Sequence, residues 1–233
     1  MFHDPKMTPA PNEQETKLGF LLMAATLLVA PTALYLLNSL LPKPLSDGML
    51  NTVFYVTNFA LTILIFRKFL KNALEAALAR PFPVIWYAIL GYLGYQALSS
   101  ILSMGILAID PDFSNVNDDS IFDMLGDDLV PLAMAAVFLV PLTEEALYRG
   151  LLFHKLYEKK PIWAYIVSML GFAAIHVMGY IGTQPPLVLF LCFLQYLPAG
   201  YCLCWCYRRT GTILCPVLMH TIVNASSILY YLR

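Results

Sequence analysis

Seven long apolar stretches limit the folds open to this chain more than any other feature. They cover Leu18–Leu41, Met49–Phe66, Val84–Ile109, Leu129–Phe153, Ile162–Ile181, Leu187–Tyr207 and Thr212–Leu232. A stretch of about 20 apolar residues is long enough to cross the hydrocarbon core of a bilayer as a helix. Because lipid offers no hydrogen bonds, each such stretch must pair its own backbone groups. Charged residues make up only 12% of the chain, against about 25% in soluble domains. The sequence therefore predicts an all-α, polytopic membrane bundle of about seven transmembrane helices.

The basic residues indicate how these helices are oriented. If the chain crosses the membrane seven times from a cytoplasmic N-terminus, all but two of the basic residues outside the spans fall on the cytoplasmic side. They are Lys6, Lys17, Arg67, Lys68, Lys71, Arg80, Lys155, Lys159, Lys160, Arg208 and Arg209. Only Lys43 and the final Arg233 fall on the other side. Since cytoplasmic loops carry an excess of Lys and Arg, this pattern favours a cytoplasmic N-terminus.

Three segments outside the spans, and one proline inside the first span, carry local signals. Residues 1–17 are polar and contain three prolines, which predicts a disordered cytoplasmic tail. Pro31 predicts a kink in the first span. Arg67–Arg80 combines basic residues with apolar ones at helical spacing, as in a short interfacial helix. Asp110–Asp128 is acidic and lacks basic residues, so we expect a solvated loop there, with attraction of cationic peptides as the alternative.

Five ionisable residues lie inside the spans, all of them in the second half of the chain. Glu144, Glu145 and Arg149 share the fourth span, His176 lies in the fifth and His220 in the seventh. A charge at the centre of a bilayer costs about 2.5–3.5 kcal/mol even on the most lenient scale. Residues retained at this cost mark a functional site by default.

The spacing within the fourth span separates the two glutamates. Glu145 and Arg149 are four residues apart with the acid first, the favourable order for an ion pair on a helix. We expect this pair to be structural. Glu144 points about 100° further around the helix, so it is free to face a polar cavity as a general base.

The two membrane histidines add donors and a second polarising group. His220 and Asn224 are four residues apart on one face of the seventh span, from which both can present N–H groups to one point, as an oxyanion hole requires. His176 follows small residues that permit close helix packing, and it can polarise the water that Glu144 activates. The structural alternative is that each histidine only forms hydrogen bonds between helices.

Three motifs, in this order, resemble those of a known family. Glu144 to Arg149 reads E-E-x-x-x-R, Phe172 to His176 reads F-x-x-x-H, and His220 to Asn224 reads H-x-x-x-N. They resemble the type II CAAX prenyl endopeptidases and bacteriocin-processing proteins, the CPBP or Abi family. The stretch Ala199–Asn224 also resembles that family's closing region, and the resemblance covers Leu129 to Leu232.

The resemblance implies an intramembrane endopeptidase that cleaves with a glutamate-activated water. In that family one glutamate and one histidine activate the water, another histidine and an asparagine stabilise the oxyanion, and further motif residues support the site. Carried onto this chain, these are Glu144 with His176, His220 with Asn224, and the supporting Glu145, Arg149 and Phe172. The expected organisation is a tail over residues 1–17, support helices over 18–128 and a catalytic core over 129–232.

A zinc-dependent mechanism is the alternative for the same residues. Glu144, His176 and His220 match the His₂Glu sets that leave a coordination position open for water. However, the sequence has no H-E-x-x-H and no C-x-x-C, and the amide of Asn224 is a poor zinc ligand. We therefore expect no cofactor, with zinc as the alternative.

Two other functions are compatible with buried acid and imidazole groups. One is a non-catalytic bacteriocin immunity or scaffold protein, and the other is a proton-coupled transporter, although no inverted repeat supports it. For the peptidase we expect a peptide or membrane-protein substrate, a lipid bilayer as surroundings and no nucleic-acid partner. The compact chain without an ER-retrieval tail favours the cytoplasmic membrane of a bacterium.

Overall fold

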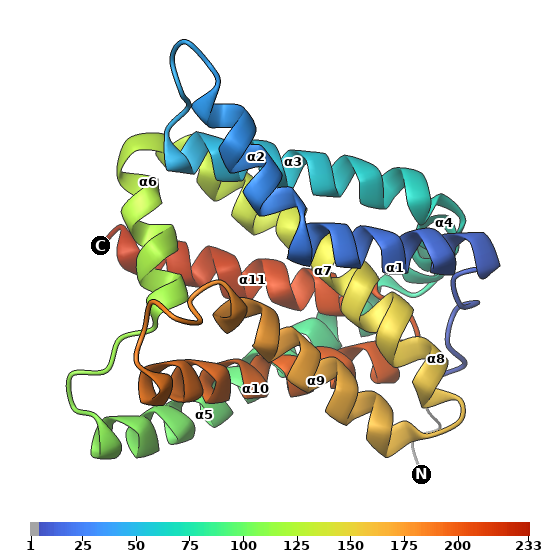
Figure 1. The fold of residues 1–233 in the computed structure, drawn as a ribbon. Helices are drawn as coiled ribbons and strands as arrows, with labels where there is room; N and C mark the ends of the chain where they lie inside the picture. The colour runs from blue at the N-terminus through green and yellow to red at the C-terminus, as the bar shows by residue number, and fades with distance from the viewer. Residues whose placement is uncertain (1–4) are drawn as a thin grey trace.

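A computed structural model describes residues 5–233, and helices dominate these residues, with no strand among them. The elements are α1 Glu13–Leu28, α2 Ala30–Ser39, α3 Asp47–Ile65, α4 Arg67–Ala79, α5 Pro81–Ile109, α6 Val116–Met134, η1 Ala135–Leu139, α7 Val140–Glu145, η2 Ala146–Phe153, α8 His154–Tyr157, α9 Pro161–Met178, α10 Pro186–Thr210 and α11 Leu214–Tyr231. The two η elements are π-helical. The predicted all-α bundle is confirmed (Figure 1).

The membrane-spanning helices lie where hydropathy predicts them. Within the described residues, six helical stretches are long and apolar enough to cross a bilayer, and α1 with α2 makes a bent seventh. The two parts of that pair meet at 52°, with Val29 at the break and Pro31 in the first turn of α2. Because proline has no backbone N–H and its ring clashes with the preceding turn, the expected kink forms here.

The fourth span departs from a regular α-helix. It runs from Asp128 to Tyr157, and two π-helical segments interrupt it, η1 before the short α7 and η2 after it. Pro141, in the first turn of α7, has no N–H to donate to the preceding turn. Such π-helical turns are frequent at functional sites. Both glutamates of the span lie in α7, and Arg149 lies in η2.

The tail prediction is wrong for residues 13–17, which form the start of α1, whereas residues 5–12 contain no helix and residues 1–4 lie outside the described part of the chain. Helix α1 begins at Glu13, where Asn12 and Glu15 form a reciprocal capping box. The buried carboxylate of Glu15 also accepts the N–H groups of Lys68 and Phe69 in the first turn of α4, at 2.9 and 3.0 Å. Polar residues here cap helix ends and do not remain solvated, which is why composition alone misreads the segment.

The basic segment after the second span forms a helix, α4, as predicted. Phe69, Ala73 and Ala77 are buried against the bundle, whereas Leu74 and Leu78 remain 49% and 69% exposed. Some apolar side chains of α4 therefore face the bundle, and others face the surroundings of the protein. In Figure 1, α4 and α8 lie at the end of the bundle where α1 begins, and the C-terminus lies at the opposite end, beside α6. An odd number of crossings, as predicted, gives this arrangement.

The acidic segment Asp110–Asp128 is not a loop over most of its length. Helix α6 begins at Val116, and the side chain of Asn115 caps it by accepting the N–H groups of Asn117 and Asp118. Acidic side chains in a first helical turn are favoured by the helix dipole. Asn115 followed by Asp118 and Asp119 is a pattern typical of a helix start. The prediction of a loop considered only the acidic composition and overlooked this pattern.

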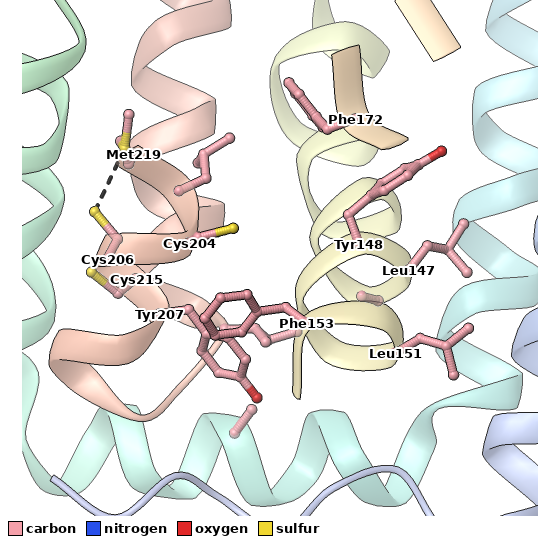
Figure 2. Packing of buried hydrophobic residues seen from close by; sticks show 14 of the residues in the cluster. Leu147, Tyr148, Leu151, Phe153, Phe172, Cys204, Cys206, Tyr207, Cys215 and Met219 are labelled. Atoms are coloured by element: carbon pink, nitrogen blue, oxygen red, sulfur yellow. Dashed lines mark hydrogen bonds between the residues drawn. The ribbon is translucent and has the colours of Figure 1, made fainter. Parts of the chain in front are cut away.

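A continuous hydrophobic core lies between the C-terminal helices and the helices packed against them (Figure 2). Tyr148 and Phe172 pack edge-on with ring centroids 5.9 Å apart, and the Sγ atom of Cys206 lies 3.6 Å from the Sδ atom of Met219. All five cysteines of the chain fall within the described residues and are buried free thiols. Their role here is packing.

Candidate active site

Glu145 is the hub of a buried ionic cluster. The Arg149 Nη1 atom lies 2.9 Å from Glu145 Oε1, and both side chains are fully buried. The Nδ1 atom of His220, on α11, lies 3.0 Å from the same oxygen. The predicted pair of Glu145 and Arg149 therefore forms, and the same carboxylate also fixes the position of a histidine from another span.

Arg149 extends this cluster to two more helices. Its Nη2 atom donates to the carbonyl oxygen of Gly200 in α10 at 3.2 Å. Its guanidinium carbon lies 4.5 Å from the ring centroid of Phe172 in α9, a distance typical of cation–π contacts. One cation thus joins η2, α9 and α10, and Phe172 contacts the site through Arg149.

Glu144 differs from its neighbour in having a carboxylate that faces a cavity. Its side chain is 19% exposed, and its Oε2 atom lies 4.0 Å from His220 Nε2. Within residues 5–233 this oxygen has no hydrogen-bond partner. The cavity measures about 370 Å³, and Glu144, His176, His220 and Asn224 all line it. The structure therefore brings together, around one cavity, the four residues expected to be catalytic.

The hydrogen bond of His176 identifies which ring nitrogen is available. Its Nδ1 atom lies 2.8 Å from the carbonyl oxygen of Phe172. Because a carbonyl oxygen only accepts, the proton is assigned to Nδ1, which leaves Nε2 as an acceptor. The imidazole also stacks on Tyr196 of α10, with ring centroids 4.0 Å apart and 22° between the planes.

Asn224 lines the cavity, and one of its donors is already engaged. Its Nδ2 atom donates to the carbonyl oxygen of Ala136 in η1 at 2.9 Å. An amide nitrogen carries two N–H groups, so one remains available. The expected convergence of His220 and Asn224 on one cavity is thus met, but each side chain also has a fixed partner in the protein.

Sequence reasoning missed a polar network between α6 and α10. The Tyr196 hydroxyl donates to Asp118 Oδ1 at 2.9 Å and accepts from Asn117 Nδ2 at 3.0 Å. Next to it, Asn115 Nδ2 donates to Gln195 Oε1 at 2.7 Å. Burial raises the pKa of the Asp118 carboxyl, and the hydrogen bond from Tyr196 opposes this shift. The only signal in the sequence was the N-cap at Asn115.

Further cavities adjoin the site. An apolar recess of about 70 Å³ lies between α1, α3 and the fourth span, and Leu27, Tyr55, Glu144 and Leu147 are among its lining residues. A wider cavity of about 680 Å³ opens between α2, α3 and α6, and it shares Pro31 and Phe54 with the cavity that Glu144 lines.

A cavity of about 160 Å³ lies on the side of α5, and His176, His220 and Asn224 are among its lining residues. Three of the four catalytic candidates therefore line a second cavity as well.

The proposed zinc set does not fit the placement of the side chains. Across the described residues, no group of three His, Cys, Asp or Glu side chains is placed to hold a metal ion. In the His₂Glu set, Nδ1 of His176 faces a backbone carbonyl and Nδ1 of His220 faces Glu145, so only the Nε2 atoms could act as ligands. No step below runs through a metal.

These helices make the chain an integral membrane protein, and the site combines the acid and imidazole groups that hydrolytic enzymes use. Residues 126–226 match the model of the family described as type II CAAX prenyl endopeptidase Rce1-like. This match confirms the resemblance given by the three motifs. No curated protein and no solved structure matches the chain.

Proposed function

We propose that the chain is an intramembrane endopeptidase in which Glu144 activates the water that hydrolyses a peptide bond. The observation that carries the proposal is the contrast between two adjacent carboxylates. Glu145 is fully buried and its Oε1 atom contacts Arg149 and His220 at 2.9 and 3.0 Å, whereas the side chain of Glu144 is 19% exposed and lines the cavity. A free carboxylate beside imidazoles is suited to general base catalysis.

In the proposed reaction, Glu144 accepts a proton from a water molecule whose oxygen attacks the scissile carbonyl carbon. The available Nε2 atom of His176 holds the same water. When the C–N bond breaks, the proton held by Glu144 passes to the leaving amine, and the products are a carboxylic acid and an amine. The chemistry is balanced without any further reactant.

The oxyanion of the tetrahedral intermediate needs hydrogen-bond donors fixed in advance. We assign this role to the free amide N–H of Asn224 and to His220, which donates from Nε2 as an imidazolium because its Nδ1–H is engaged with Glu145. Glu145 and Arg149 support it, because Glu145 holds the imidazole of His220 at 3.0 Å and Arg149 neutralises Glu145. Supporting residues of this kind set the geometry on which catalysis depends.

The substrate proposed is a peptide precursor or a membrane-protein segment that enters the cavity from within the bilayer. The apolar recess beside Glu144 accepts an apolar side chain next to the scissile bond, since its lining is mainly hydrophobic. We further propose a bacterial cytoplasmic membrane with the N-terminus in the cytoplasm. The basic residues support this orientation, because α4, α8 and the start of α1 share one end of the bundle (Figure 1).

The test is cleavage of a fluorogenic peptide library by purified protein in liposomes. Glu144→Gln and His220→Ala are compared with wild type, and Glu158→Gln is the matched control because its side chain is 66% exposed at the end of the fourth span. We expect the two site variants to lose about 10²–10⁴-fold in turnover and the control to match wild type. Equal turnover by all four proteins would remove the peptidase proposal and favour the non-catalytic immunity or scaffold role.

A further inference from the structure

Three contacts fix the imidazole of His176. One face stacks on Tyr196, with centroids 4.0 Å apart and 22° between the planes. The ring of Phe172 lies against it at 4.7 Å and 53°. The third contact is the hydrogen bond from Nδ1 to the Phe172 carbonyl at 2.8 Å. Phe172 belongs to the same helix as His176, so Tyr196 is the contact that comes from another helix.

Tyr196 is itself held from the far side by the first turn of α6. Its hydroxyl donates to Asp118 at 2.9 Å and accepts from Asn117 at 3.0 Å. Next to Tyr196, Gln195 accepts a hydrogen bond of 2.7 Å from Asn115, which joins the start of α6 to α10 a second time. Both Asp118 and Tyr196 line the cavity that contains Glu144 and His176. The acidic helix start is thus connected to the site by a chain of direct contacts.

We propose that Tyr196, held in place by Asp118, is a positioning residue for His176, so that the first turn of α6 is part of the active site. This inference rests on the proposed peptidase function. The stacked ring prevents the imidazole from rotating about its side-chain bonds, and the hydroxyl fixes where the tyrosine ring lies. Nε2 of His176 is thereby kept toward the cavity.

The expected effects follow from this order of contacts. A misplacement of about 1 Å in a catalytic group costs on the order of 10²-fold in rate, so Tyr196→Leu should lower kcat about 10- to 100-fold and change KM less than about threefold. Tyr196→Phe keeps the stacking ring and should recover most of kcat. Asp118→Ala removes the acceptor of the hydroxyl and should resemble Tyr196→Phe. Tyr201→Leu is the matched control, because Tyr201 lies on the same helix, is 46% exposed and contacts the ring of Tyr165.

The experiment measures kcat and KM of these five proteins in liposomes, together with ¹⁵N NMR spectra of protein labelled on histidine. We expect the wild-type spectrum to show His176 protonated at Nδ1 only, and that of Tyr196→Leu to show a mixture of tautomers. Unchanged kcat and unchanged tautomer in Tyr196→Leu would overturn the proposal, as would a loss in kcat that Tyr196→Phe does not recover. If Tyr196→Leu fails to fold, Tyr196→Met takes its place because it also lacks the stacking ring, and unchanged kcat and His176 spectra in Tyr196→Met would also overturn the proposal.

The spectra require no substrate. If wild type cleaves no peptide but the tautomer still changes in Tyr196→Leu, the proposed function fails while the positioning contact stands. If wild type cleaves peptides and Tyr196→Leu does so equally well, the positioning role alone fails.

Discussion

Replacing Arg149 by methionine tests whether the buried cluster neutralises Glu145. The guanidinium and the carboxylate are both fully buried and 2.9 Å apart, and Arg149 also donates to the Gly200 carbonyl. Removing one partner of such a pair costs about 3–5 kcal/mol, because the other charge remains buried without compensation. Arg149→Met should therefore lower the free energy of unfolding by this amount, which is roughly a 10²–10³-fold change in the equilibrium.

The double variant Glu145→Leu with Arg149→Met separates stability from activity. It removes both charges, and the remaining cost is the loss of the hydrogen bonds that the Gly200 carbonyl and His220 make to the cluster, about 0.5–1.5 kcal/mol each. We expect it to be more stable than Arg149→Met alone. It should nevertheless be inactive, because His220 has lost the carboxylate that holds it at 3.0 Å.

The assay is equilibrium unfolding in mixed micelles with increasing denaturing detergent, followed by helix content and paired with peptide cleavage by the same samples. Arg149→Met as stable as wild type would refute the reasoning about an uncompensated charge. A double variant less stable than Arg149→Met, or one with full activity, would contradict the assignment of Glu145 as the hub.

Three further predictions concern the metal and the packing of the support helices. Cleavage by wild type should be unchanged after dialysis against a strong zinc chelator, and a loss that added zinc restores would establish the metal-dependent alternative. Gly91→Ala should destabilise the protein by about 1–3 kcal/mol, because its Cβ would lie 2.9 Å from the Met219 sulfur, whereas Gly105→Ala, with nothing within 4 Å, should not. Glu15→Ala should lower stability by about 0.5–2 kcal/mol through loss of the cap on α4, with the exposed Glu13→Ala as control; equal melting temperatures of the two variants would contradict this.

The sequence was sufficient to locate the spans and to predict that the candidate residues lie around one cavity. Hydropathy located each membrane helix because twenty apolar residues in a row have few alternatives. The order of the polar residues within those helices predicted that Glu144, His176, His220 and Asn224 would share a cavity, and they do. The inference worked because an ionisable group inside a membrane must face the bundle interior.

The spacing of residues along one helix could not predict the contacts between different helices. The i,i+4 rule links Glu145 to Arg149 on one helix, but it gives no information about His220, which approaches from α11. Tyr196 was missed because an aromatic residue inside a span usually serves only to pack the helices together. The acidic segment was misread because its composition resembles a solvated loop, whereas Asn115 caps a helix there.

The π-helical turns of the fourth span also follow from tertiary packing. They place Glu144 and Glu145 on a short helix between η1 and η2, and the carbonyl of Ala136 in η1 accepts the amide of Asn224. Propensities for such turns are weak, so a run of apolar residues predicts only a straight helix. The π-helical turns and the hydrogen bond between Asn224 and Ala136 could therefore be learned only from the structure.

The most direct test of the central claim is the origin of the oxygen in the cleaved product. Wild-type protein is incubated with a cleaved peptide in water enriched in ¹⁸O, and both the products and the intact protein are weighed by mass spectrometry during the first turnover. If Glu144 activates water for direct attack, the new carboxyl group carries one ¹⁸O atom, no peptide is attached to the protein, and Glu144→Gln forms product at least about 100-fold more slowly. A peptide covalently bound to the protein during turnover, or full activity of Glu144→Gln, would contradict the account.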